Sequence, residues 1–216
     1  YGMISHIDDC IGRVISTLKE TGQYDNTVIV FMADHGEYLG SHNLLMKDVW
    51  AYEELARVPY IWKGTAGQTK DVSQSVVSLL DFVPTILDYA DVSTDDLDTR
   101  GEGRGPRLGL PGRSLRPQIQ DGQPLSPEPA LIEYDEDWWP APLCRQRGLI
   151  DGDFKLIIYG GYEDEGLLFN LTDDPHEMNN LWQEPEFQTT KHELTQKLLH
   201  KLTMSDRFDT KRICGA

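Results

Sequence analysis

The residues best suited to chemistry follow a short apolar segment near residue 30. Residues 28–32 are all apolar, and Asp34, His35 and Gly36 come just after them. Such a run is typical of a strand buried on both faces, and in open α/β sheets ligands bind beyond the carboxyl ends of such strands. A carboxylate oxygen and a neutral imidazole nitrogen can together hold a divalent cation, and Gly36 lets the backbone turn sharply beside them.

The Asp-His pair on its own also has a structural interpretation. Aspartate is a common helix N-cap, and a single histidine often has no chemical role. The residues that follow distinguish the two interpretations, since His42 lies in the next loop, Lys47 follows it, and Arg57-Val58-Pro59 opens another predicted strand. Taken alone, Lys47 would be an ordinary surface lysine.

Several segments together resemble one family. The segments ADHGEYLGSHNLLMK and YEELARVPYIWKG resemble the metal-binding segment of the sulfatase family, in the alkaline phosphatase superfamily. The segment VVSLLDFVPTILDYADV resembles a later part of the same family, and LLFNLTDDPHEMNNLW resembles its C-terminal signature. The resemblance implies an α/β fold, part of an alkaline-phosphatase-like sandwich with helices on a mostly parallel sheet, plus a small C-terminal antiparallel-sheet subdomain with a terminal helix.

This resemblance divides the chain into three parts. Residues 1–90 are expected to be the C-terminal part of the catalytic α/β domain, with the metal-binding segment. Residues 91–129 are rich in Gly, Pro and Arg and indicate a loop or linker. Residues 130–216 are expected to form a small C-terminal α+β subdomain.

One family motif is absent from the sequence. Sulfatases carry upstream a Cys-x-Pro-x-Arg or Ser-x-Pro-x-Arg motif, whose first residue is oxidised to formylglycine. Cys10 is followed by Ile-Gly-Arg-Val, Cys144 by Arg-Gln-Arg-Gly, and Cys214 by only Gly-Ala, so no cysteine fits. The chain therefore resembles the C-terminal part of a sulfatase, the formylglycine is expected only in a missing N-terminal part, and this chain alone is expected to be inactive.

The resemblance implies roles for four residues. Asp34 and His35 would bind a divalent metal, for which calcium is the first expectation. Many sulfatases have asparagine in place of His35, so the nitrogen ligand leaves manganese or magnesium as alternatives. Lys47 would hold a sulfate oxygen as a point charge. His42 would either protonate the leaving oxygen or serve as a hydrogen-bond donor within the loop.

The implied activity is hydrolysis of the sulfate esters of small molecules or carbohydrates. One alternative is hydrolysis of phosphonate monoesters or phosphodiesters, because enzymes of the same superfamily share similar segments. The other is a truncated or split-chain protein without catalytic activity. A catalytic fragment without the first strands of its sheet exposes an edge and apolar surface, so we expect it to associate with the missing N-terminal part or with itself.

Composition restricts the partners. The formal charge is −16, from 20 basic and 36 acidic side chains, which disfavours nucleic acids and anionic membranes. The sequence shows no transmembrane segment and no signal peptide, which favours the cytoplasm. Three scattered cysteines form neither a disulfide framework nor a zinc cluster.

The N-terminal elements are predicted from apolar spacing and breakers. Residues 1–20 form a helix expected to cover one face of the sheet, followed by strands at 27–33 and 58–63 and a helix begun by Asp81. Glu53 and Arg57 have the i,i+4 spacing of a surface ion pair. Within 91–129 an alternative is a basic recognition patch of Arg100, Arg104, Arg107, Arg113 and Arg116.

The C-terminal part predicts a small antiparallel sheet. Strands are expected at 130–134, 144–150, 154–159 and 166–171, with a hairpin at Asp151-Gly152 and a helix at 191–202. Trp138 and Trp139 could stack on a sugar or aryl group or anchor the sheet. The segment TDDPHEMNN is interpreted as a turn rather than a second metal site.

Overall fold

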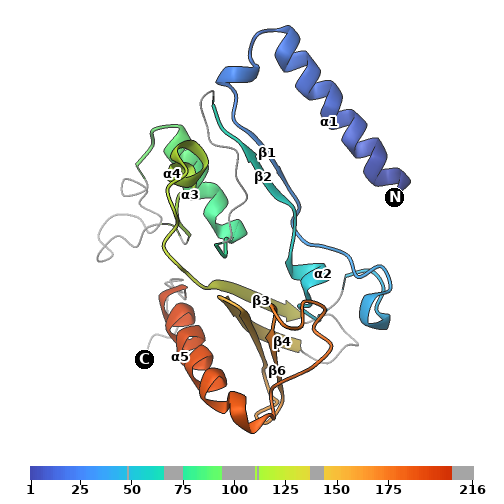
Figure 1. Ribbon diagram of the computed structural model, residues 1–216, viewed down its shortest axis with the longest axis vertical. Helices are drawn as coiled ribbons and strands as arrows, with labels where there is room; N and C mark the ends of the chain where they lie inside the picture. Colours follow the sequence, from blue (N-terminus) through green and yellow to red (C-terminus); the bar gives the residue numbers. More distant parts are fainter. Residues whose placement is uncertain (48, 66–74, 94–109, 111, 137–143, 206–216) are drawn as a thin grey trace, which may run out of the picture.

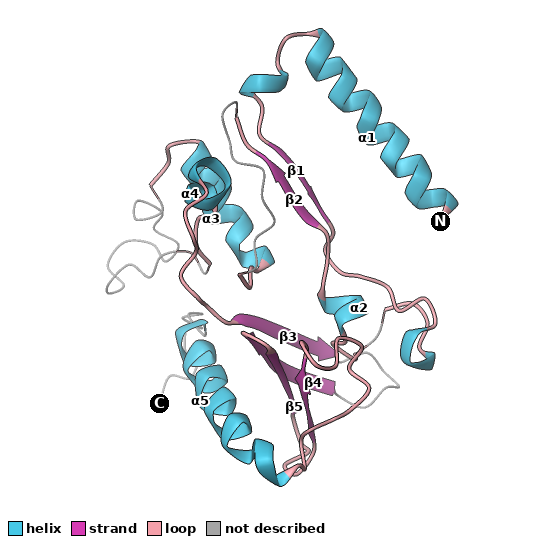
Figure 2. Ribbon diagram, viewed as in Figure 1, coloured by secondary structure: helices cyan, strands magenta, loops and turns pink. Residues whose placement is uncertain are grey.

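The computed structural model describes residues 1–47, 49–65, 75–93, 110, 112–136 and 144–205 (Figure 1). These residues form two small antiparallel sheets and a set of helices, which Figure 2 shows by type. The helices are α1 (Gly2–Glu20), α2 (Glu53–Ala56), α3 (Phe82–Tyr89), α4 (Arg116–Asp121) and α5 (Gln188–Ser205). The strands are β1 (Ile29–Met32), β2 (Tyr60–Lys63), β3 (Ala130–Glu136), β4 (Cys144–Asp151), β5 (Phe154–Tyr159) and β6 (Gly166–Asn170).

Helix α1 forms where the apolar spacing predicts it, but its packing differs from the expectation. None of its residues is buried, and Met3, Ile4, Ile7 and Val14 are each more than half exposed. The prediction that this helix covers one face of the sheet is therefore not met within this chain. Cys10 on this helix is a free, exposed thiol, whereas the side chains of the other two cysteines lie outside the described residues.

Strands β1 and β2 pair antiparallel, with Ile29 opposite Lys63 and Met32 opposite Tyr60. The mostly parallel sheet that the family resemblance implies has no parallel pair among the described strands. The reason is the connection: the chain between β1 and β2 makes short helical turns and folds back, whereas a parallel pair needs a crossover past the sheet. Phe31 and Ile61, on the two strands, remain exposed, and no residue of β1 is fully buried, so the prediction of a strand buried on both faces is wrong for this chain.

Helix α3 begins after Asp81, as the sequence predicts, but the Asp81 side chain does not cap it; instead a capping box with Ser78 as the N-cap forms in the short 3-10 turn Leu79–Asp81 just before α3. The Ser78 hydroxyl accepts the Leu80 N–H at 3.2 Å, and the Asp81 carboxylate accepts the Ser78 N–H at 3.0 Å. The second Asp81 oxygen accepts the Arg113 N–H at 2.9 Å. Asp81 therefore also attaches residues after 112 to this helix.

The predicted linker is partly helical. Helix α4 lies within residues 91–129 and ends at Gly122, which adopts a left-handed φ of 68°. Arg113 donates to the Val76 carbonyl at 2.9 Å, and Arg116 pairs with Asp88 at 3.2 Å. Both arginines of the suggested basic patch that the structure describes thus have partners in the fold; Arg100, Arg104 and Arg107 lie outside the described residues.

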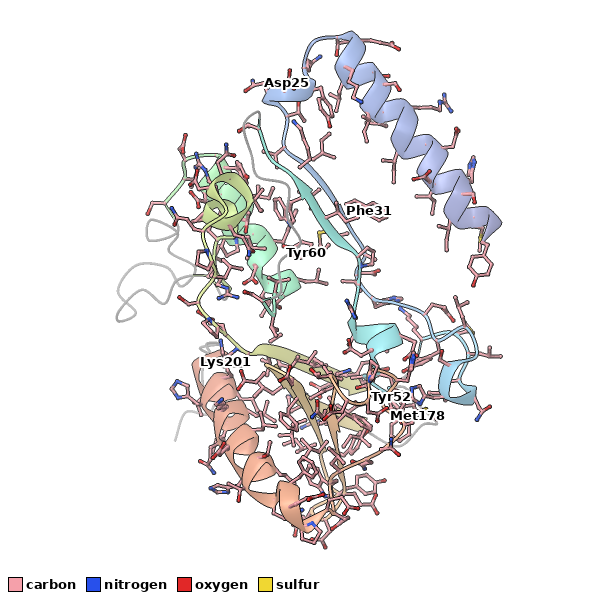
Figure 3. All side chains as sticks on the ribbon, viewed as in Figure 1. Asp25, Phe31, Tyr52, Tyr60, Met178 and Lys201 are labelled. Carbon is pink, nitrogen blue, oxygen red and sulfur yellow. The ribbon has the colours of Figure 1, made fainter. Side chains whose placement is uncertain are left out.

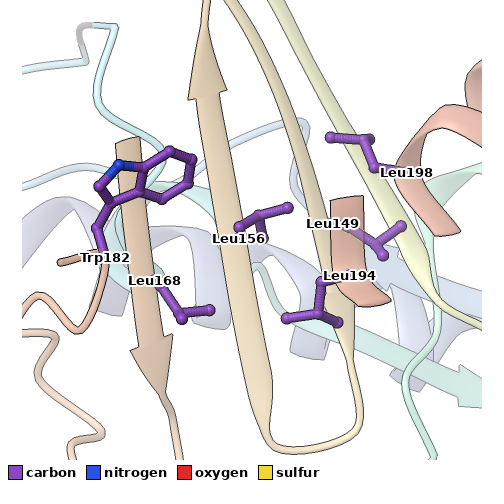
Figure 4. Packing of buried hydrophobic residues seen from close by; sticks show 6 residues of the cluster. All are labelled: Leu149, Leu156, Leu168, Trp182, Leu194 and Leu198. Atoms are coloured by element: carbon purple, nitrogen blue, oxygen red, sulfur yellow. The ribbon is translucent and has the colours of Figure 1, made fainter. Parts of the chain in front are cut away.

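The C-terminal sheet has the order β3-β4-β5-β6, all antiparallel, as expected. The β4–β5 hairpin turns at Gly152, whose φ of 57° favours glycine. Helix α5 covers one face of this sheet (Figure 4). The core beneath it consists of Leu149, Leu156, Leu168, Trp182, Leu194 and Leu198. This is the main apolar core among the described residues.

The sheet accommodates Trp182 through a glycine. A Cβ on Gly166 would lie 2.4 Å from the Trp182 ring, so only glycine allows the indole to pack there. The segment TDDPHEMNN, just before this tryptophan, forms turns, which confirms the sequence interpretation. Trp138 and Trp139 lie outside the described residues, and none of the helices that the structure describes is long and apolar enough to cross a membrane.

Candidate functional site

The candidate site begins two residues after β1, at Asp34. Its side chain is 89% exposed, and one carboxylate oxygen accepts the His35 N–H at 3.0 Å. The backbone N–H groups of Asp34 and His35 hold the pKa of this carboxyl below its usual range, and the charges of His35 and Lys47 act in the same direction. Asp34 therefore presents an ionised, accessible carboxylate.

The tautomer of His35 follows from its neighbours. Its Nδ1 lies 2.8 Å from the Gly36 carbonyl, which can only accept, so Nδ1 carries the proton. In the neutral ring this leaves the lone pair on Nε2, which lies 3.7 Å from the Asp34 carboxylate. One nitrogen donor and one oxygen donor thus lie near each other just after β1.

Gly36 is required by a close approach rather than by a sharp turn. A Cβ at this position would lie 1.8 Å from the Glu54 carbonyl oxygen. The backbone here pairs with α2, because the Gly36 N–H donates to Leu55 at 2.8 Å and the Glu37 N–H donates to Glu54 at 3.1 Å. The residues after the Asp-His pair are thereby held against α2.

His42 is also held by the segment around α2. Its backbone adopts a left-handed φ of 52°, and its ring stacks on Tyr52 with centroids 3.8 Å apart. The His42 Nε2 lies 3.7 Å from the Glu54 carboxylate, and the His42 side chain is only 11% exposed. Among the described residues, the contacts of His42 are with Tyr52 and Glu54 rather than with Asp34.

Lys47 is the last of the four predicted site residues. It is exposed, and its charge contributes to lowering the pKa of Asp34. Within the part of the chain that the structure describes, it has no hydrogen bond or ion pair. Lys47 is therefore a cation near Asp34 that is available to an anion.

A buried ionic cluster behind α2 was not predicted. The Glu53 carboxylate lies 2.8 Å from the Nζ of Lys155, and Lys155 also contacts Glu177 at 2.8 Å. The predicted Glu53–Arg57 surface pair is therefore wrong: α2 ends at Ala56, and Glu53 points to the C-terminal sheet. Tyr52, which Figure 3 labels, precedes Glu53 in the sequence, and its ring centroid lies 6.2 Å from that of Phe169.

Sequence reasoning missed four residues that contact α2 or the loop beside the site: Tyr52, Glu54, Lys155 and Glu177. The usable signal was Lys155, a lysine inside an apolar strand, since a lysine buried there needs charged partners. Glu177 stood in a segment interpreted only as a turn.

The donor set fits part of a metal site. Asp34 supplies oxygen and His35 supplies nitrogen, a combination suited to a divalent ion. Among residues 1–47, 49–65, 75–93, 110, 112–136 and 144–205, no group of three His, Cys, Asp or Glu side chains converges on one point. A complete coordination shell would therefore need further donors besides Asp34 and His35.

Comparison with known proteins defines the class. Residues 1–92 match the family model described as Sulfatase. The chain is 33% identical over 222 residues to the multifunctional alkaline phosphatase superfamily protein PehA of Trinickia caryophylli, an alignment covering 95% of this chain and 40% of that protein. It is 41% identical over 216 residues to an arylsulfatase of Clostridium perfringens, covering 94% of this chain and 39% of that protein.

A solved structure with a similar fold supports the family assignment. It is that of a protein in complex with its substrate D-glucosamine-2-N,6-O-disulfate, with a TM-score of 0.76 and 29% identity, covering 95% of this chain and 40% of that one. The α/β fold expected from the sequence is confirmed, and it is that of the alkaline phosphatase superfamily. The chain belongs to the sulfatase family. It spans about 40% of the length of the first curated relative.

Proposed function

We propose that the protein containing this chain hydrolyses sulfate esters. The observation that carries the proposal is the Asp34–His35 pair, in which an ionised carboxylate lies 3.7 Å from an imidazole nitrogen with a free lone pair. The pair lies inside the segment that matches the Sulfatase family model. The substrate-bound relative supports a sulfated carbohydrate as the substrate class.

In this proposal Asp34 and His35 hold a divalent metal ion. Calcium is the first expectation, and the imidazole nitrogen keeps manganese and magnesium as alternatives. When bound, such an ion would offset negative charge on the sulfate oxygens. Hydrogen bonds from the backbone keep Asp34 ionised, and the Gly36 carbonyl keeps the proton of His35 on Nδ1, away from the metal side.

The proposal gives Lys47 and His42 different roles. Lys47, exposed and without a partner among the described residues, would hold a sulfate oxygen. For His42, the sequence left proton donation and loop anchoring open. Its low exposure and its contacts with Tyr52 and Glu54 favour anchoring.

The nucleophile is proposed to come from elsewhere in the protein. None of the three cysteines is followed by x-Pro-x-Arg, so formylglycine cannot form within these 216 residues by the family's motif. The division of the chain at about residues 90 and 129 is likewise part of the proposal. Under it, the 216-residue chain alone is inactive and associates either with an N-terminal part of the protein or with itself.

A second candidate activity is hydrolysis of phosphonate monoesters or phosphodiesters. The similarity to PehA favours keeping it, since that relative is described as a multifunctional member of the superfamily. The two candidates differ in the reacting atom, while the metal pair and Lys47 serve both.

The test is an ester-hydrolysis assay on the full polypeptide that carries this chain, with chromogenic sulfate and phosphate esters and added Ca²⁺, Mn²⁺ or Mg²⁺. Asp34→Ala should lower metal-dependent turnover at least about 100-fold. The matched control is Asp25→Ala, which removes an exposed carboxylate from the turn before β1 and should leave turnover unchanged.

The ratio of sulfate to phosphate turnover chooses between the two activities. Metal-loaded protein that carries formylglycine and hydrolyses none of these esters would reject both.

A further inference from the structure

The buried side chain of Lys155 is the most unusual feature outside the candidate site. It lies in β5 between apolar neighbours and is fully buried. Its Nζ contacts three oxygens: Glu53 at 2.8 Å, Glu177 at 2.8 Å and the Ala51 carbonyl at 2.9 Å. The contact with Ala51 is a hydrogen bond, and the contacts with Glu53 and Glu177 are ion pairs. The ammonium thus ties two segments, residues 51–53 and the turn at Glu177, to the sheet.

Glu177 makes a second link to α2. Its other carboxylate oxygen accepts the N–H of Glu53, the first residue of α2, at 2.6 Å. The N-cap residue Tyr52 provides no side-chain cap, so this remote carboxylate satisfies one of the N–H groups that a helix leaves unpaired. Burial raises the pKa of Glu177, while the charge of Lys155 and the Glu53 N–H oppose the shift.

The same short helix contacts the candidate site on its other side. The carbonyls of Glu54 and Leu55 accept the N–H groups of Glu37 and Gly36. The Glu54 carboxylate and the Tyr52 ring hold His42. Helix α2 therefore lies between the ionic cluster and the loop that carries the predicted ligands.

We propose that Lys155 is a positioning residue for the candidate site: together with Glu177 it fixes α2 to the C-terminal sheet, and α2 fixes the backbone beside Asp34 and His35. A buried ion cluster is a poor source of stability, because well-packed apolar side chains often do as well. It does impose one geometry, since the ammonium must meet a carbonyl and two carboxylates at once.

The experiment measures amide hydrogen exchange in the full polypeptide that carries this chain and in its Lys155→Met variant, which keeps the length of the side chain and removes its charge. The Gly36 and Glu37 amides should exchange at least about tenfold faster, while the β4 and β5 amides keep their protection. The matched control is Lys197→Met, which removes an exposed lysine of α5 paired with Asp151 and should leave Gly36 and Glu37 unchanged.

Equal exchange at Gly36 and Glu37 in Lys155→Met and Lys197→Met would overturn the proposal. So would a uniform loss of protection that includes β4, because Lys155 would then stabilise the sheet alone. Should Lys155→Met not fold, Glu177→Gln, which keeps the side-chain shape, is measured against the same two criteria.

A second readout rests on the proposed function: in the full polypeptide, Lys155→Met should weaken Mn²⁺ binding about tenfold, with Lys197→Met unchanged. Undiminished Mn²⁺ affinity in Lys155→Met would overturn the positioning role. Absence of ester turnover in the wild type would reject the proposed function and leave the exchange result in force.

Discussion

Replacing Gly36 by alanine tests whether the backbone beside Asp34 must lie against α2. The new Cβ would lie 1.8 Å from the Glu54 carbonyl oxygen and 2.9 Å from its carbon. The two segments would have to separate by about 1.5 Å to restore ordinary contact. The hydrogen bonds from Gly36 to Leu55, at 2.8 Å, and from Glu37 to Glu54, at 3.1 Å, do not survive such a shift.

The expected cost follows from these two effects. Crowding of a packed region costs about 1–3 kcal/mol, and each lost hydrogen bond costs about 0.5–1.5 kcal/mol. The free energy of opening this loop should therefore fall by about 2–6 kcal/mol. Amide exchange at Glu37, measured by NMR, should accelerate at least about 30-fold. The Mn²⁺ affinity of the full polypeptide should fall with it.

Gly12→Ala is the control for this substitution. A Cβ there meets no atom within 4 Å, and the residue lies inside α1, so alanine should stabilise the helix by about 0.5–1 kcal/mol. Exchange at Glu37 should not change. If Gly36→Ala left exchange at Glu37 as slow as it is in the wild type, the close backbone approach would not exist in solution, and the reasoning from α2 to the site would be refuted.

Three further outcomes are expected. Leu156→Ala, under α5, should lower the free energy of unfolding by about 2–5 kcal/mol in urea titration, whereas the exposed Leu199→Ala should change it little. Arg147 donates two hydrogen bonds, at 2.9 and 3.0 Å, to the Asp135 carboxylate and lowers the pKa of that carboxyl. Arg147→Met should raise this pKa toward its usual value, and an unchanged pKa of Asp135 in an NMR titration would contradict this. Burial raises the pKa of Glu177, so as pH rises the unfolded chain releases this proton before the folded chain does. The resulting contribution to the free energy of unfolding is complete below the unfolded pKa and is lost as pH rises through the folded pKa. Glu177→Gln should remove this part of the pH dependence of stability, and a variant whose stability changes with pH in the same way as the wild type would refute it.

Features governed by neighbouring residues were predictable from the sequence. The apolar strand and the Asp34–His35 pair after it depend on a few consecutive residues. The hairpin at Gly152 and the start of α3 after Asp81 follow from turn and helix-start signals in the same way. In each case the residue types alone restrict the local backbone.

Features governed by distant partners were not predictable. The i,i+4 rule paired Glu53 with Arg57, but α2 is only one turn long, and the actual partner of Glu53 lies in β5. Gly36 was expected to serve a turn, whereas its requirement comes from a carbonyl of another segment. The packing of α1 was predicted from its apolar face, which identifies a surface suited to burial but not what would cover it; among the described residues nothing buries it.

The hydrogen bond between Glu53 and Glu177 can form only late during synthesis of the chain. The two residues are 124 positions apart, so a ribosome adding 5–20 residues per second takes roughly 6–25 s to pass from one to the other. Throughout that interval the nascent chain carries the Asp-His loop and α2 without the Glu177 carboxylate that accepts the Glu53 N–H. A chain interrupted between these two residues would therefore retain Asp34, His35, His42 and Lys47 while lacking the carboxylate that accepts the first N–H of α2.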